Sequence, residues 1–167
     1  MFDKIDLRAY TPIMDNSQEN TLDSQARQIA MNCACFKLRK ASRAITQYYD
    51  AALEECGLKV TQLTLLVSLS IAGPVSVSTL AEELVMDRTT LTRNVDVLVK
   101  NGLAEVEQGK DKRVKLLKVT QSGRDILLKA FPLWEEAQNS LLARLGKQNW
   151  SELSKKLAAV TTLASIQ

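Results

Sequence analysis

Apolar residues along this chain follow two different spacings. Over most of the sequence they recur every three to four residues, which is the period of an amphipathic helix. Between residues 103 and 119 they occur instead in two short runs on either side of a polar loop that contains glycine. The pattern predicts strands at residues 103–107 and 114–119, and helices at residues 21–56, 60–72, 76–84, 88–100, from 121 towards 139, and from Asn149 or Ser151 onward.

Capping residues define the ends of the two short helices at residues 76–84 and 88–100. Thr79, with Glu82 three residues later, fits a capping box for the first of them. The carboxylate of Asp87 can accept backbone N–H groups at the start of the second, where the helix dipole also favours a negative charge. Gly102 supplies a left-handed residue that ends this helix. Two short helices followed by a hairpin predict a winged helix-turn-helix.

The second short helix carries small hydroxyl groups and long cations outside its apolar stripe, which consists of Leu91, Val95, Leu98 and Val99. The major groove of duplex DNA admits such a helix, because arginine pairs with guanine, asparagine with adenine, and a threonine methyl group contacts thymine. A merely solvated helix face is also polar, so this composition leaves both interpretations open. The candidate DNA-contacting residues are Arg88, Thr89, Thr90, Thr92, Arg93 and Asn94.

Positive charge is concentrated in the same part of the chain. Residues 87–118 contain eight Lys and Arg against five Asp and Glu, so this segment holds the whole net charge of +3. Binding to DNA phosphates explains such a concentration. The hairpin and its loop contribute five candidate DNA-binding residues: Lys110, Asp111, Lys112, Arg113 and Lys115. Lys110, Lys112 and Lys115 are expected to attract phosphates.

Five segments of the chain together form a recognisable pattern: Leu80-Ala-Glu-Glu-Leu84, Met86-Asp-Arg-Thr-Thr-Leu-Thr-Arg93, Val97-Leu-Val-Lys-Asn-Gly-Leu103, Asp111-Lys-Arg113 and Val119-Thr-Gln-Ser-Gly123. With them the chain resembles the MarR family of winged-helix transcriptional regulators, from about residue 32 to near the C-terminus. The resemblance implies that Arg113 enters the minor groove, that Asp111 steadies it by an ion pair, and that two copies place their recognition helices in successive major grooves of a pseudo-palindromic operator. It also implies a homodimer that usually acts as a repressor.

Length and pattern predict one globular domain of four regions. With 167 residues, of which 46% are hydrophobic and 25% charged, the chain resembles an ordinary globular protein. The helix at residues 21–56 has a broad apolar stripe, which needs a second subunit as well as its own domain to cover it. The regions are an N-terminal arm at residues 1–20, a dimerisation helix at 21–56, the winged helix-turn-helix at 57–120, and C-terminal dimerisation helices at 121–167.

Composition argues against several classes of protein. No apolar run approaches the roughly 18 residues of a membrane span, and the N-terminus does not resemble a signal peptide, so a cytoplasmic protein is expected. The sequence has no histidine, which weakens hydrolase and zinc hypotheses. No cofactor, metal or enzymatic activity is expected. A protein-interaction module that binds no DNA remains the alternative from another class.

Cys35 is singled out by a resemblance to the organic-hydroperoxide-sensing branch of the MarR family. The reactive cysteine of that branch falls on Cys35, and Tyr49 matches one of the tyrosines that hydrogen-bond it. Arg39 and Val60 depart from the pattern, because the branch has its other tyrosines there. Thiol-based peroxide sensing through Cys35 is therefore an alternative, beside the interpretation of this cysteine as an inert packing residue.

Two further hypotheses concern the long N-terminal helix. Cys33 and Cys35, two apart on one helix, point about 200° from each other, so they are not expected to share a metal ion or to close a disulfide. Arg39, Arg43 and Tyr49 are candidate polar handles for a small aromatic or anionic effector in a cleft beside the winged domain. Arginine–carboxylate pairs across the dimer explain the two arginines equally well.

Overall fold

The computed structural model describes residues 16–109 and 114–164, and the side chains from residue 21 to 163 outside the loop at 110–113. The chain divides into two compact units, Met1–Ile45 and Thr46–Gln167. Among the described residues, no helix is both long and apolar enough to cross a membrane. Most of the predicted N-terminal arm lies outside the described residues.

The first unit contains α1 (Asn16–Asn32) and most of α2 (Ala34–Ala52). The prediction of one helix over residues 21–56 is wrong, because the helix is interrupted at Cys33 and α2 ends at Ala52. The break is local, since the backbone N–H of Cys33 still bonds Ile29 O at 2.8 Å and that of Lys37 bonds Cys33 O at 3.1 Å. No proline or glycine lies there, and nothing in the structure explains the break.

The second unit is organised around α3 (Val60–Ala72), whose start is held by the end of α2. The carboxylate of Asp50 accepts the backbone N–H of Val60 at 2.7 Å, because the first amides of a helix lack partners within it. The buried side of α3, formed by Leu63, Leu65, Leu66 and Leu69, enters the main apolar core. The sequence of α3 is apolar on nearly all sides and would suit a fully buried helix, but Val67 and Ile71 are 41% and 78% exposed.

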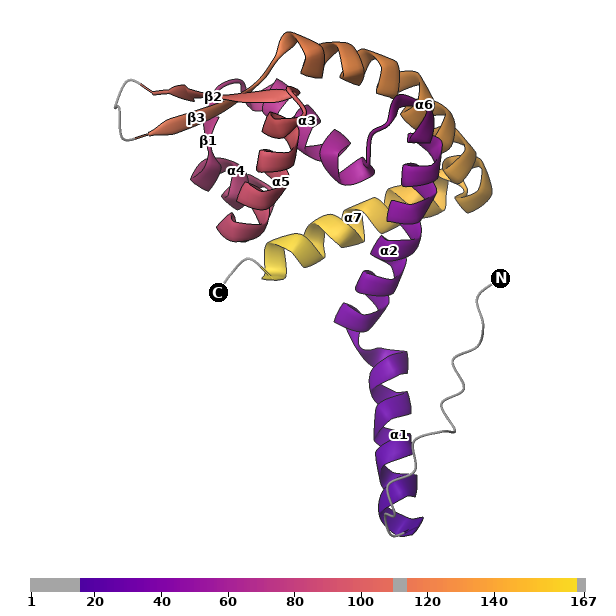
Figure 1. Cartoon of the computed structure of the whole chain (residues 1–167). Coiled ribbons are helices and arrows are strands. Elements are labelled where there is room, and N and C mark those ends of the chain that lie inside the picture. Colours follow the sequence, from indigo (N-terminus) through magenta and orange to yellow (C-terminus); the bar gives the residue numbers. More distant parts are fainter. Residues whose placement is uncertain (1–15, 110–113, 165–167) are drawn as a thin grey trace. The chain divides into compact units, whose positions relative to one another are not determined.

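The helix-turn-helix and its hairpin pack against α3 (Figure 1). They comprise α4 (Val77–Glu83), α5 (Arg88–Lys100), β2 (Ala104–Gln108) and β3 (Lys115–Val119). A third strand, β1 (Val75–Ser76), pairs antiparallel with β3, so the sheet order is β1-β3-β2. The sequence pattern missed β1, because two residues are too few to show an alternation.

Two helices follow the hairpin, α6 (Gln121–Leu145) and α7 (Lys147–Ala164). Pro132 lies inside α6 without ending it, so this helix runs past the expected end near residue 139. Gly146, with φ at 87°, separates the two helices, and α7 begins at Lys147 rather than at the predicted Asn149 or Ser151. α7 packs on α6, yet its apolar residues Leu153, Leu157 and Val160 stay exposed in the single chain.

Candidate nucleic-acid interface

The turn between α4 and α5 is set by two capping side chains. Ser76 caps α4, because its hydroxyl accepts the backbone N–H of Thr79 at 3.1 Å. The capping box expected from Thr79 is therefore wrong, since Thr79 is already the third residue of the helix. Val85 then takes a left-handed conformation with φ at 52°, which costs a β-branched residue about 1–3 kcal/mol. The turn is thus a constrained one, and it sets the angle at which α5 leaves.

Asp87 caps α5 as the sequence predicts. Its carboxylate accepts the backbone N–H of Thr90 at 2.8 Å. Hydrogen bonds from the Thr90 side chain and then the Thr90 backbone are the largest causes that hold the pKa of Asp87 below its ordinary value of 3.8. α5 spans Arg88–Lys100, as predicted, and Gly102 follows it in the left-handed region with φ at 69°.

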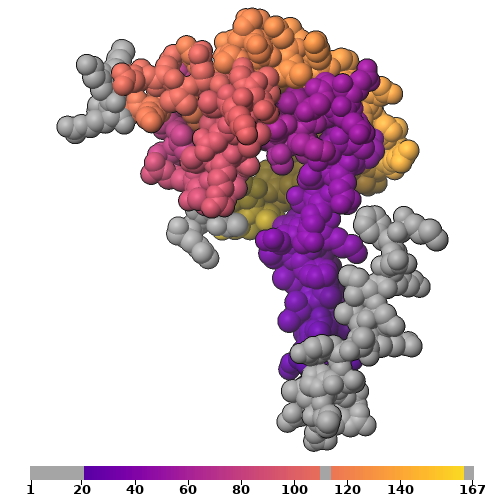
Figure 2. All heavy atoms as spheres, viewed as in Figure 1, coloured from indigo at the N-terminus to yellow at the C-terminus, as the bar shows by residue number. Residues whose placement is uncertain are grey.

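α5 has one buried side and one exposed side. Leu91, Val95 and Leu98 are buried, whereas the expected fourth core residue, Val99, is 36% exposed. Arg88, Thr89, Thr90, Thr92 and Arg93 are all exposed. The same part of the chain lies at the surface of its unit in the space-filling view (Figure 2). Five of the six candidate residues on α5 are therefore available to a partner.

Asn94 is the sixth candidate residue on α5, and it lies on the flank of the helix. It is half-buried and lines a small hollow of about 110 Å³ beside the start of α3. Residues of α3, including Gln62 and Leu65, line the same hollow. Asn94 is thus less accessible than the other five. Thr92 is exposed, although its hydroxyl donates to Arg88 O at 2.7 Å.

The hairpin has a regular antiparallel register from Ala104 opposite Val119 to Gln108 opposite Lys115. The backbone N–H of Gly109 bonds Val114 O at 2.8 Å beyond the last pair. Lys115 is exposed near this end of the hairpin. The other four candidate residues of the wing, Lys110, Asp111, Lys112 and Arg113, lie outside the described residues.

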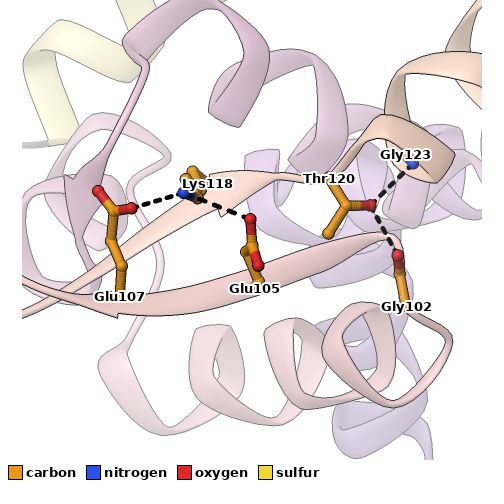
Figure 3. A network of polar contacts seen from close by, with 6 residues as sticks. All are labelled: Gly102, Glu105, Glu107, Lys118, Thr120 and Gly123. Atoms are coloured by element: carbon orange, nitrogen blue, oxygen red, sulfur yellow. Dashed lines mark hydrogen bonds and ion pairs between the residues drawn. The ribbon is translucent and has the colours of Figure 1, made fainter.

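Lys118 joins the two strands on their outer face (Figure 3). Its ammonium lies 2.6 Å from the Glu107 carboxylate and 3.4 Å from that of Glu105. Hydrogen bonds to Glu107 and then Glu105 raise the pKa of Lys118 above its ordinary value. Although Lys118 belongs to the positively charged segment, its charge is thus shared with two carboxylates of its own hairpin.

Thr120 connects the hairpin, the end of α5 and the start of α6. Its hydroxyl donates to Gly102 O at 2.6 Å and accepts the backbone N–H of Gly123 at 3.0 Å (Figure 3). Gly123 is required here, because a Cβ would overlap the carbonyl oxygen of Leu103 and lie 2.7 Å from Val119 Cγ1. A displacement of α6 at this point is therefore transmitted to the ends of α5 and β3.

The candidate effector residues are separated by the structure into two environments. Tyr49 belongs to the second unit, is 7% exposed, and donates its hydroxyl to Gln138 Oε1. Burial, and secondarily the neighbouring Tyr48, raises the pKa of Tyr49. Arg39 and Arg43 belong to the first unit and line a hollow of about 480 Å³ together with Cys35.

Metal ligands do not gather in the part of the chain that the structure describes, where no three or more Cys, Asp or Glu side chains are placed to hold an ion. Cys33, Cys35 and Cys56 are all free thiols. The half-buried Cys56 donates its thiol to Leu53 O at 3.1 Å within its own helical turn.

Comparison with known proteins identifies the fold and its family. Residues 57–114 match the sequence profile of the MarR family. The DNA complex of the M. tuberculosis transcriptional regulator MosR superposes with a TM-score of 0.73 at 38% identity, covering 80% of this chain and 96% of MosR. The chain belongs to the MarR family. This confirms the predicted resemblance and the predicted fold, mainly helical with a small β wing and with helices at both ends of the chain.

Two further relatives of this MarR-family protein overlap with it over different lengths. A HTH-type transcriptional regulator of Bacillus subtilis (strain 168), YwoH, is 31% identical over 85 residues, which are 51% of this chain and 62% of YwoH. A mutant MarR from E. coli complexed with operator DNA has a TM-score of 0.72 at 22% identity, and covers 79% of this chain and 96% of that one. At that identity the E. coli structure supports the fold alone.

The Asp87 cap should make stability depend on pH. Folding lowers the pKa of this carboxyl. Its contribution to the free energy of unfolding is therefore present above about pH 4 and is lost as pH falls through the pKa of the folded protein. Asp87→Ala should lower the urea midpoint at pH 7, and the difference from the unsubstituted protein should shrink towards pH 2.

Asp87→Ser is the matched control, because serine caps a helix without titrating. At pH 7 the urea midpoint of Asp87→Ser should lie closer to that of the unsubstituted protein than the midpoint of Asp87→Ala does. A difference between Asp87→Ala and the parent that stays constant from pH 7 to pH 2 would contradict this account of the cap.

Proposed function

We propose that this protein is a homodimeric, sequence-specific regulator that binds duplex DNA, and that it represses transcription until an effector releases it from a pseudo-palindromic operator. The proposal rests on α5, which has one buried side and one exposed side. Its buried leucines and valine fix it to the core, and Arg88 and Arg93 extend from the exposed side together with three threonines. That combination suits a recognition helix in a major groove.

The hairpin supplies the electrostatic part of the proposed interface. Lys115 and the loop residues Lys110 and Lys112 would attract phosphates, while Arg113, with Asp111 beside it, would enter the minor groove. MosR, at 38% identity, has been crystallised with DNA, which supports the same use of the fold here. Two copies must present their recognition helices about one turn of DNA apart, on the order of 34 Å.

Exposed apolar stripes on the first unit support the homodimer. Leu22, Ile29 and Phe36 are spaced by seven residues and are 57%, 62% and 50% exposed. Leu22 and Ile29 lie on α1 and Phe36 on α2, and seven-residue spacing places Leu22 and Ile29 along one side of α1, as in packing between helices of two chains. A second exposed apolar stripe with the same spacing consists of Met31 on α1 and of Leu38 and Ile45 on α2. Two uncovered stripes favour a partner of the same chain.

A groove between α3 and α6 supports an effector with an aromatic or apolar body. It measures about 550 Å³, within the range of small-molecule sites, and none of the described residues that line it is charged. Val67 and Ile71 contribute from α3, and Leu128, Phe131 and Trp134 from α6. This groove suits an uncharged ligand better than an anion. Since the Tyr49 hydroxyl is already bonded to Gln138, it is a poor handle for an anion.

Peroxide sensing through Cys35 is the second candidate for the signal. Cys35 is exposed and shares the hollow in the first unit with Arg39, Lys40 and Arg43. These cations give the hollow a positive charge that can attract the polar end of a hydroperoxide. In this alternative the effector would be a hydroperoxide and the response covalent.

Substitutions on α5 and on the hairpin should affect DNA binding differently. Arg93→Ala should weaken binding to sequences enriched from a random duplex pool by about tenfold or more, with less effect on random DNA, because a base contact is lost. Lys115→Ala should weaken binding to the enriched sequences and to random DNA alike, and it should reduce the slope of log affinity against log salt by about one. Fluorescence anisotropy over a salt series measures both effects.

Lys155→Ala is the control for charge, because it removes an exposed cation from α7. It should leave affinity and salt slope unchanged. A parent protein whose affinity for duplex DNA is absent or independent of salt would contradict the proposal, and would favour the protein-interaction alternative.

Charged substitutions on the first apolar stripe should separate the dimer. Ile29→Asp combined with Phe36→Asp should raise the dimer dissociation constant by at least about a hundredfold, since each buried side chain of this size contributes about 1.5–3 kcal/mol. Sedimentation equilibrium measures the mass. Gln28→Asp changes an exposed polar residue of the same helix and should leave the dimer intact. A parent protein that sediments as a monomer would contradict the proposed dimer.

The α3–α6 groove should distinguish ligands by charge. In a calorimetric titration, indole should bind with measurable heat, and benzoate should bind at least about tenfold more weakly. Phe131→Ala should weaken indole binding by about tenfold, because the contact with the phenyl ring is lost. Lys129→Ala, at a neighbouring exposed position outside the groove, is the control for α6. Equal binding of the two probes, or unchanged binding to Phe131→Ala, would contradict this site.

A further inference from the structure

Val85, in the turn between α4 and α5, has a backbone conformation that glycine normally adopts. Its backbone N–H bonds Glu82 O at 3.2 Å, and the backbone N–H of Met86 bonds Ala81 O at 2.8 Å. These two bonds are the pattern of a helix end at which the residue after the C-cap is left-handed. Val85 occupies that place with φ at 52°. Glycine adopts such a φ without cost, whereas the branched Cβ of valine is strained there.

The strain is not offset by burial of the Val85 side chain. Val85 is 63% exposed, and among the described residues it neither belongs to the main core nor packs against it. Its neighbours Leu84 and Met86 are half-buried and pack against that core. The turn therefore directs its flanking residues inward and Val85 outward. Backbone strain without a packing reason is typical of functional sites.

Val85 lies beside the part of α5 that is proposed to enter DNA. Asp87 caps α5 two residues later, and Arg88, Thr89 and Thr90 follow on the exposed first turn. In helix-turn-helix proteins the N-terminal residues of the recognition helix contact base edges in the major groove. An outward side chain on the turn that leads into this helix is therefore expected at the mouth of the same groove.

The groups around Val85 favour an apolar contact over a phosphate contact. Glu82, Glu83 and Asp87 are exposed, and their carboxylates repel phosphates. The methyl groups of valine neither donate nor accept hydrogen bonds, so they cannot read the polar edges of the bases. The apolar group that the major groove presents is the C5-methyl group of thymine. Val85 is thus suited to a thymine rather than to a phosphate.

We propose that Val85 is a specificity-determining residue that contacts the methyl group of one thymine in each half-site of the operator. The inference rests on the proposed function, because it requires α5 to be the recognition helix of a DNA-bound dimer. It adds a residue that precedes the Asp87 cap to the six candidate residues of α5, all of which follow that cap. The left-handed backbone then has a role, since it turns the valine away from the core and towards the DNA.

The test compares thymine with uracil, which pairs with adenine in the same way and lacks only the methyl group. Each thymine of a duplex enriched from a random pool is replaced by uracil in turn. Fluorescence anisotropy then measures the affinity of the parent protein, Val85→Gly and Val85→Ala. At one thymine of each half-site the replacement should weaken binding of the parent by about fourfold, as expected for one buried methyl group. The same replacement should not weaken binding of the two variants further.

Both variants should bind the unmodified duplex about fourfold more weakly than the parent does. Val85→Gly should not lower the urea midpoint, because removal of the strain offsets the greater freedom of glycine in the unfolded chain. Weaker binding is then not a loss of fold. Val67→Ala is the matched control, because it shortens an exposed valine of α3. It should bind the unmodified and the uracil-containing duplexes as the parent does.

Three results would overturn the inference alone: a loss on uracil replacement that is the same in both Val85 variants as in the parent at every position, unchanged affinity of both variants for the unmodified duplex, or a lower urea midpoint in Val85→Gly. The first result would assign the thymine contacts to other residues, such as the threonines of α5. A parent protein that binds no sequence more tightly than random DNA would overturn the proposed function, and this inference with it. Binding of the parent therefore separates the two failures.

Discussion

The structure of the second unit depends on the burial of one side of α5. Leu91 and Leu98 are fully inaccessible and Val95 nearly so, and they join the leucines of α3 in the main core. Burial of side chains of this size stabilises by about 1.5–3 kcal/mol each. That burial fixes which face of α5 is turned to solvent, so the exposure of Arg88 and Arg93 follows from packing behind the helix rather than from any contact that the two arginines make.

Two polar junctions then relate α5 to the elements beside it. At its start, Asp87 accepts an amide of the first turn, directly after the strained turn at Val85. At its end, Thr120 holds Gly102 and the start of α6 through one hydroxyl group, and Gly123 leaves no room for a side chain. α5 is thus connected at its far end to α6, the longest helix among the described residues. A ligand in the groove along α3 and α6 would bind to elements that already contact the helix-turn-helix and its hairpin.

The net charge of the hairpin does not show which of its charges are paired with one another. Lys118 is placed between Glu105 and Glu107, so that its ammonium is bonded within the hairpin. Exposed ion pairs of this kind contribute little to stability. They do, however, reduce the repulsion that two unpaired carboxylates would exert on phosphate. The cation left exposed on the described strands is Lys115, close to the end that carries the loop.

The sequence by itself determined the order of the helices and strands from α3 to α7 apart from β1, the limits of α5, the Asp87 cap and the left-handed Gly102, because each follows from local periodicity or from a backbone preference within a few residues. It also carried the resemblance to the MarR family. Only the tertiary structure decided that Ser76 rather than Thr79 caps α4, that a two-residue β1 completes the sheet, that Val99 is exposed and that Asn94 is half-buried. These depend on what packs against a residue, which periodicity does not specify. The break at Cys33 is of the same kind, since nothing in the local sequence marks it.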